Sequence, residues 1–133
     1  MQKLLLAYDG TDHSRRALEL VAVLTKQFGA TLTVVSVVPT RPGRSPVDPW
    51  DDTELHTQEL IEAGRLLREQ GIEARLIESA GDVAHRIEHL AAEGDYDAIV
   101  VGSRGLTAVG RALQGSVSEH VATHSTATVV VAR

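Results

Sequence analysis

Residues 97–120 read DAIVVGSRGLTAVGRALQGSVSEH, and this stretch decides the fold class. The apolar run over 98–101 predicts a buried strand, and a glycine-rich connection follows it over 102–114. The residues from 115 to 124 have the pattern of a short helix. A strand, a glycine-rich connection and a helix in this order are typical of an α/β protein.

The rest of the chain repeats the same alternation of apolar runs and helical patterns. The second helix is expected to turn Leu60, Ala63 and Leu67 inward, and Asp82 and Gly94 are the expected ends of the third. Strands are predicted at 3–9, 31–38, 73–79, 97–102 and 127–133, and helices at 12–28, 53–70, 82–93 and 115–124.

The first helix is marked by apolar residues that recur at helical spacing. Thr11 or Asp12 is its expected cap, and Gly29 is its expected stop. The residues at helical spacing are Ala17, Leu20, Val21, Leu24 and Phe28.

This order predicts one α/β domain over 1–133 with a doubly wound, Rossmann-like fold. Strands that alternate with helices form parallel sheets through right-handed crossovers. We expect five parallel strands in the order 3-2-1-4-5 with helices on both faces. Ligands of such sheets bind at the carboxyl ends of the strands, so Asp9, Val37 and the glycine-rich loop are the candidate site.

Composition excludes several classes of protein. The net charge of −5 argues against broad nucleic-acid binding, and the absence of cysteine excludes disulfides and thiol chemistry. The N-terminal residues are too few and too polar for a signal sequence or a membrane span, so we expect a cytoplasmic protein.

All four prolines and Trp50 lie within 39–52, which predicts a long surface loop. This loop is either a solvated connector or a flap beside the site. The sequence does not decide between the two, nor whether Trp50 covers the site.

The glycine-rich loop has the composition of a phosphate-binding segment. No carboxylate occurs from Ala98 to Ser118, whereas Arg104 and Arg111 add positive charge. Free backbone N–H groups at glycines and at a helix start bind anions. The alternative is a plain connection whose hydroxyls cap a helix. A P-loop is excluded because no lysine lies beyond position 26, and the G-x-G-x-x-G fingerprint is absent after the first strand.

Taken with the loop, the whole chain resembles the ATP-binding branch of the universal stress proteins. The resemblance rests on G-x2-G-x9-G-S, read here as Gly102, Gly105, Gly115 and Ser116. Five further segments agree with it in order: LLLAYDGTDHSRRALE, TLTVVSVV, GDVAHRI, YDAIVVGSRG and GSVSEHVATHSTATVVVAR.

The resemblance implies roles for individual residues. Asp9 and Ala7 would lie at the base and ribose end of a bound nucleotide, and the Val37 backbone would meet the adenine. Val101 precedes Gly102 and Gly105, which would lie beneath the ribose and phosphates. Amides and hydroxyls of Gly115, Ser116, Val117 and Ser118 would hold the phosphates, which carry a Mg²⁺ ion themselves.

Other candidate sites have weaker support. The pairs His85/His89 and His120/His124 have the i, i+4 spacing of metal ligands, yet solvated helix faces explain them better. Ser116 has no histidine placed to activate it as a nucleophile.

We therefore expect an ATP-binding, stress-response regulator without dedicated catalysis. Mg-ATP would order the 102–118 loop, and an unidentified protein partner could recognise the ordered loop. The resemblance implies a homodimer through the C-terminal strand. The alternatives are a nucleotide-free dimeric scaffold and a slow ATP hydrolase. Neither the stress nor the physiological nucleotide follows from the sequence.

Overall fold

The computed structural model describes residues 1–39, 49–102 and 127–132, with only the backbone described at 39 and 49–55. The predicted loop residues 40–48, the glycine-rich loop and the expected last helix lie outside these ranges. The elements are β1 (Lys3–Ala7), α1 (Asp12–Phe28), β2 (Thr31–Pro39), α2 (Pro49–Glu69), β3 (Arg75–Gly81), α3 (Val83–Glu93), β4 (Ala98–Gly102) and β5 (Thr128–Ala132).

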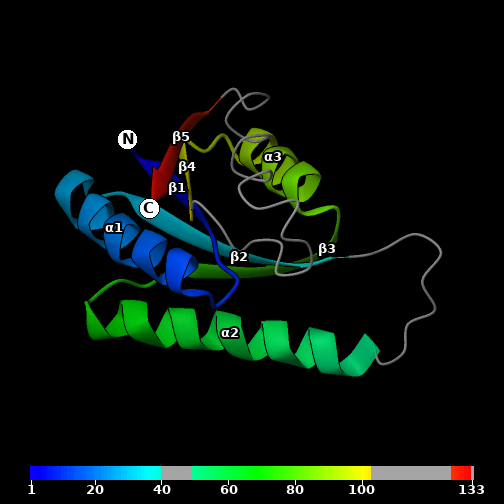
Figure 1. Cartoon of the computed structure of the whole chain (residues 1–133). Coiled ribbons are helices and arrows are strands. Elements are labelled where there is room, and N and C mark those ends of the chain that lie inside the picture. The colour runs from blue at the N-terminus through cyan, green and yellow to red at the C-terminus, as the bar shows by residue number, and fades with distance from the viewer. Residues whose placement is uncertain (40–48, 103–126, 133) are drawn as a thin grey trace.

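The five strands form one parallel sheet in the order β3-β2-β1-β4-β5, as the sequence predicts. Helices α1 and α2 cover one face of the sheet and α3 covers the other (Figure 1). The chain runs outward from β1 to β3 on one side, and it returns to pair β4 with the other side of β1. The strand order therefore reverses between β1 and β4, where α/β sheets bind ligands.

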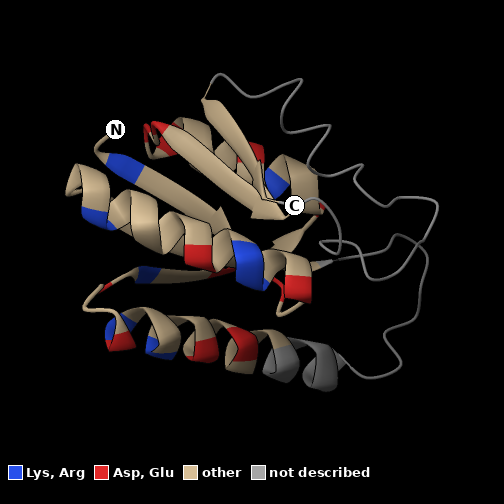
Figure 2. Ribbon diagram, turned by 60° about the vertical axis from the view of Figure 1, so that its left-hand side comes forward, with Lys and Arg blue, Asp and Glu red and all other residues tan. Residues whose placement is uncertain are grey.

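Side-chain alternation along β1 divides the core between the two faces. Leu4, Leu6 and Tyr8 pack against α1 and α2, whereas Leu5 and Ala7 pack against α3. All five side chains are buried because helices cover both faces of the parallel sheet. Charged side chains lie mainly on the helices, and the described part of α2 carries both acidic and basic residues (Figure 2).

The helix ends are set by the residues expected to set them. Thr11 caps α1 by accepting a hydrogen bond from Ser14 N, and Gly29 ends this helix in the left-handed conformation at φ 59°. Asp82 caps α3 by accepting from His85 N at 3.0 Å. Phe28, which the helical spacing placed with the apolar residues of α1, is 53% exposed at the end of the helix.

The predicted bounds of the 39–52 loop were wrong at both ends, and Pro39 is the last residue of β2. Helix α2 begins at Pro49 rather than at Thr53, so the last four residues of the predicted 39–52 loop are helical. Proline is compatible with the first turn of a helix because the N–H that it lacks has no partner there. High proline content therefore did not exclude helix at this position.

The amino ends of β1, β2 and β4 are joined by polar contacts. The Asp97 carboxylate accepts hydrogen bonds from Gln2 N at 2.7 Å and Lys3 N at 2.9 Å, which lower the pKa of Asp97. The Tyr96 hydroxyl donates to Thr33 Oγ1 at 2.7 Å, and Lys3 Nζ lies 4.9 Å from the centre of the Tyr96 ring. These contacts fix the strands at the end of the sheet opposite the candidate site.

Candidate functional site

Strand β2 extends further than β1 at the carboxyl edge of the sheet. Ala7 pairs with Val35 as the last β1–β2 pair, and one further hydrogen bond joins Tyr8 N to Val35 O at 3.0 Å. Strand β2 continues to Pro39 beside β3. Because backbone polar groups alternate in direction along a strand, Val37 turns its N–H and C=O toward the β1 side, as Val35 does. These groups lie beyond the end of β1.

The predicted site residues on the strands are core residues. Ala7, Val37 and Val101 have exposed fractions of 1%, 8% and 0%, and all three belong to the core on the α3 side. Their side chains therefore pack inward. A ligand at this end of the sheet would meet their backbone atoms rather than their side chains.

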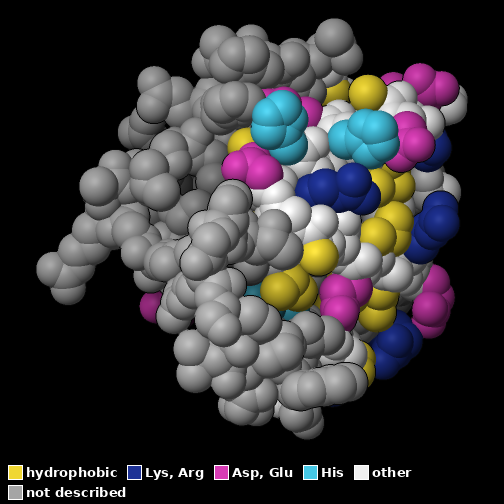
Figure 3. Space-filling view, turned by 90° about the vertical axis from the view of Figure 1, so that its right-hand side faces the viewer, with side chains coloured by type: hydrophobic (Ala, Val, Ile, Leu, Met, Phe, Trp, Pro, Cys, Tyr) yellow, Lys and Arg dark blue, Asp and Glu magenta, His cyan; other side chains and the backbone are white. Residues whose placement is uncertain are grey.

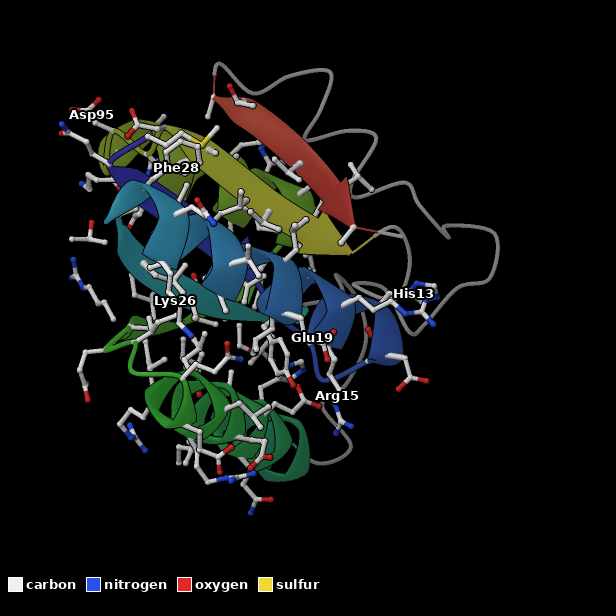
Figure 4. All side chains as sticks on the ribbon, turned by 90° about the vertical axis from the view of Figure 1, so that its left-hand side faces the viewer. His13, Arg15, Glu19, Lys26, Phe28 and Asp95 are labelled. Carbon is white, nitrogen blue, oxygen red and sulfur yellow. The ribbon has the colours of Figure 1, made fainter. Side chains whose placement is uncertain are left out.

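Gly102 ends β4 against the first turn of α1. A Cβ atom at this position would lie 2.8 Å from the backbone carbon of His13 and 2.9 Å from its carbonyl oxygen. Only glycine fits so close an approach of two backbones. Packing alone therefore explains Gly102, and it places the start of the glycine-rich loop beside the amino end of α1, near His13 and Arg15 in Figure 4.

Asp9 lies in the turn between β1 and α1 with one carboxylate oxygen satisfied and one not. Its Oδ1 accepts hydrogen bonds from Thr11 N at 3.0 Å and Thr11 Oγ1 at 2.6 Å. Its Oδ2 is buried and has no hydrogen-bond partner among the described residues. Burial raises the pKa of Asp9, and the bonds from Thr11 oppose this shift. The turn fixes the carboxylate and leaves an acceptor for a donor from outside it.

Helix α2 contributes Glu59 to the same turn. The Glu59 carboxyl group packs over Gly10, where a Cβ atom would lie 3.0 Å from Glu59 Cδ. Gly10 has φ of 79°, a conformation that glycine adopts without strain. Glu59 Oε2 is buried and has no hydrogen-bond partner among the described residues. Burial, and then the Asp9 charge, raise the pKa of Glu59 to about 7.

His56 lies one helical turn before Glu59 and joins it to β2. Its Nδ1 shares a 3.1 Å hydrogen bond with Ser36 Oγ, and Ser36 is completely buried. The same nitrogen lies 3.4 Å from Glu59 Oε2, which is ion-pair range when the imidazole is protonated. Elements β1, β2 and α2 therefore each contribute a polar side chain to this end of the sheet.

Sequence reasoning missed His56, Glu59 and Ser36. The available signal was the inward stripe of Leu60, Ala63 and Leu67, which continues by one turn to position 56. A histidine and a glutamate at the start of such a stripe indicate polar side chains directed at the sheet.

Several predicted residues lie outside the described part of the chain. These are Gly105, Gly115, Ser116, Val117 and Ser118, together with Arg104, Arg111, His120 and His124. The structure therefore does not test the phosphate-binding roles assigned to this segment or the second histidine pair.

The first histidine pair lies on α3. His89 Nε2 is 3.2 Å from Glu93 Oε2, and within the described ranges no group of three or more potential metal ligands occurs. Figure 3 shows histidine side chains beside acidic ones on the surface of the molecule. An exposed helix face explains this pair.

The site offers several hydrogen-bond acceptors to a ligand. Asp9 Oδ2 and Glu59 Oε2 are buried acceptors, and the Val37 backbone adds a donor and an acceptor beyond the end of β1. A buried acceptor without a donor costs about 1–3 kcal/mol, so a ligand that supplies donors is favoured here.

None of the helices in the described ranges is both long enough and apolar enough to cross a membrane.

Comparisons with known proteins agree with this architecture. Universal stress protein YxiE of Bacillus subtilis is 32% identical over 150 residues, which cover 98% of each chain. A universal stress protein from Archaeoglobus fulgidus in complex with dAMP has a TM-score of 0.78 at 21% identity, covering 100% of this chain and 98% of that one. A universal stress protein in complex with cAMP has a TM-score of 0.78 at 24% identity, covering 99% and 97%.

The family itself follows from the match over the complete sequence. The sequence model of the universal stress protein family matches residues 1–133. The strand order and the similarity to YxiE over nearly all of both chains are consistent with this match. The chain belongs to the universal stress protein family.

Proposed function

We propose that this protein binds adenine nucleotides, with ATP as the principal ligand, at the carboxyl ends of β1, β2 and β4. The observation that carries the proposal is Asp9 Oδ2, a buried acceptor without a donor among the described residues, held in place through Oδ1. A ribose hydroxyl or the adenine amine would supply the donor. The two solved relatives bound to cAMP and dAMP share adenine and differ in their sugars.

The backbone beside Asp9 fits the base end of such a ligand. Val37 directs an N–H and a C=O beyond the end of β1, as required for paired hydrogen bonds to adenine. Gly102 brings the start of the glycine-rich loop to the same edge of the sheet. In this proposal Gly105 and the segment Gly115–Ser118 hold the phosphates, which carry Mg²⁺.

We further propose that the protein acts as a homodimeric regulator within one domain, in the cytoplasm. Among the described strands, β5 pairs with β4 alone and forms an edge of the sheet, and Val131 is 39% exposed. An edge strand of this kind can pair with a second copy. A nucleotide bound to each copy in such a dimer would change the surface that a protein partner contacts. Equal affinity of that partner with and without ATP would rule out this regulatory role.

The test is a calorimetric titration of nucleotide-stripped protein with Mg-ATP. We expect binding that is weakened strongly by Asp9→Ala and by Gly115→Ala. Glu19→Ala on the exposed side of α1 is the control and should bind as the wild type does.

Absence of binding at millimolar ATP would contradict the proposal and leave the nucleotide-free scaffold. Turnover of ATP at roughly 1 per second or faster would instead identify an enzyme.

A further inference from the structure

Two carboxyl groups from separate elements meet at the Asp9 turn. Asp9 follows β1, and Glu59 reaches the adjacent Gly10 from α2, with 3.0 Å between Glu59 Cδ and the Cβ that Gly10 lacks. Each carboxyl group has one buried oxygen without a hydrogen-bond partner among the described residues. No sequence motif assigned Glu59 to this site.

This arrangement is costly unless donors are supplied. Neighbouring buried carboxylates repel each other, so one of them holds its proton more tightly. The raised pKa of Glu59 has this cause in part, since the Asp9 charge adds to the effect of burial. Two donors placed side by side would satisfy both oxygens and remove the conflict.

We propose that Glu59 is a specificity-determining residue of the nucleotide site, which accepts a second hydrogen bond beside the one accepted by Asp9. This inference rests on the proposed function. The site would then select ligands with two neighbouring donors over ligands with one. In a nucleotide, such donors are the two N–H bonds of the adenine 6-amino group or the 2′- and 3′-hydroxyls of ribose.

Other titratable and charged groups lie around Glu59, and His56 competes with a ligand for the same carboxylate oxygen when it is protonated. His56 lies 3.4 Å away on the same helix, and its Nδ1 also bonds Ser36. Burial raises the pKa of Tyr8, which follows β1, while Arg15 of α1 lowers it and the charges of Glu62 and Glu59 raise it further. Figure 4 shows Arg15 at the amino end of α1.

A ligand that donates to Glu59 favours the ionised carboxylate. Binding then releases the proton that Glu59 holds in the free protein, so affinity rises as the pH increases through about 7. The phosphate groups of the ligand also titrate near pH 6, but they do so equally for every variant. The difference in the pH dependence of affinity between wild type and a Glu59 variant therefore reports the titration of Glu59 alone.

The experiment measures dissociation constants of AMP, IMP, 2′-deoxyAMP and 3′-deoxyAMP at pH 6 and pH 8. The proteins are wild type, Glu59→Gln, Glu59→Met and the control Glu19→Gln. Urea unfolding verifies that each variant is folded, and the Gln variant retains the shape of the side chain if Met does not fold.

We expect wild type at pH 8 to prefer AMP by roughly tenfold or more over IMP or over the deoxynucleotides, which corresponds to one hydrogen bond to a charged group. If a Glu59 variant loses the preference for AMP over IMP, the adenine amine is the donor to Glu59. If it loses the preference for AMP over the deoxynucleotides, the ribose hydroxyls are the donors. The Met variant should lose this preference and the rise of affinity with pH.

Equal preferences in wild type and both Glu59 variants would overturn the inference and leave nucleotide binding intact. Failure of all four nucleotides to bind wild type would overturn the proposed function, and the inference with it.

Discussion

Replacing Glu59 with glutamine should make the protein more stable at high pH and leave its stability at low pH unchanged. The pKa of Glu59 is raised from 4.5 to about 7 by burial and by the Asp9 charge. A raised pKa means that the folded protein binds the proton more tightly than the unfolded chain. The associated stability is complete below about pH 4.5 and is lost as the pH rises through about 7.

The magnitude follows from the size of the shift. A change from 4.5 to about 7 corresponds to at most about 3.4 kcal/mol, at about 1.36 kcal/mol per pH unit. Solvent screening reduces this value, since one fifth of the Glu59 side chain is exposed. We therefore expect the free energy of unfolding of Glu59→Gln to be about 1–2 kcal/mol higher than that of wild type at pH 8, and equal to it near pH 4.5.

The assay is urea unfolding at pH 4.5, 6, 7 and 8, with Glu19→Gln as an exposed carboxyl control. The control should follow wild type at every pH. A gap between Glu59→Gln and wild type that stays constant with pH would refute the reasoning, as would a variant less stable than wild type at pH 8.

Four further substitutions test the packing and the proposed assembly. Gly102→Ala should cost about 1–3 kcal/mol of stability in urea unfolding, because the new methyl group meets backbone 2.8 Å away. Gly64→Ala should not cost stability, since its methyl group meets only the flexible end of a leucine; a loss as large as that of Gly102→Ala would be contrary to this account. Tyr96→Phe should lower stability by about 0.5–1.5 kcal/mol through loss of the bond to Thr33, and an unchanged urea midpoint would count against that bond. Val131→Lys should shift sedimentation from dimer to monomer if β5 forms the interface, and unchanged sedimentation would place the interface elsewhere.

Local patterns in the sequence predicted most of the fold. Apolar runs located the strands, and Thr11, Gly29 and Asp82 set helix ends where their side chains or backbone conformations require. The start of α2 was missed because proline content was read as loop, although Pro49 occupies a first turn that tolerates it.

The candidate site was only partly predictable, because it depends on contacts between distant segments. Asp9 was found because it lies at the carboxyl end of the first predicted strand and matches the family pattern. Glu59 was not found, since only the packing of α2 over Gly10 brings its carboxyl group to the Asp9 turn. The same reason applies to Gly102, whose role depends on the distance to His13 rather than on its neighbours in sequence.

The most direct test of nucleotide binding at this site is the affinity of Mg-ATP for Asp9→Asn. The asparagine Oδ1 can still accept both bonds from Thr11, so the amide nitrogen takes the place of Oδ2. A donor would then face the donor of the ligand. We predict at least a tenfold loss of affinity without a loss of stability, since the substitution also removes the charge that repels Glu59. Equal affinity of Asp9→Asn and wild type would contradict the assignment of Asp9 to the nucleotide.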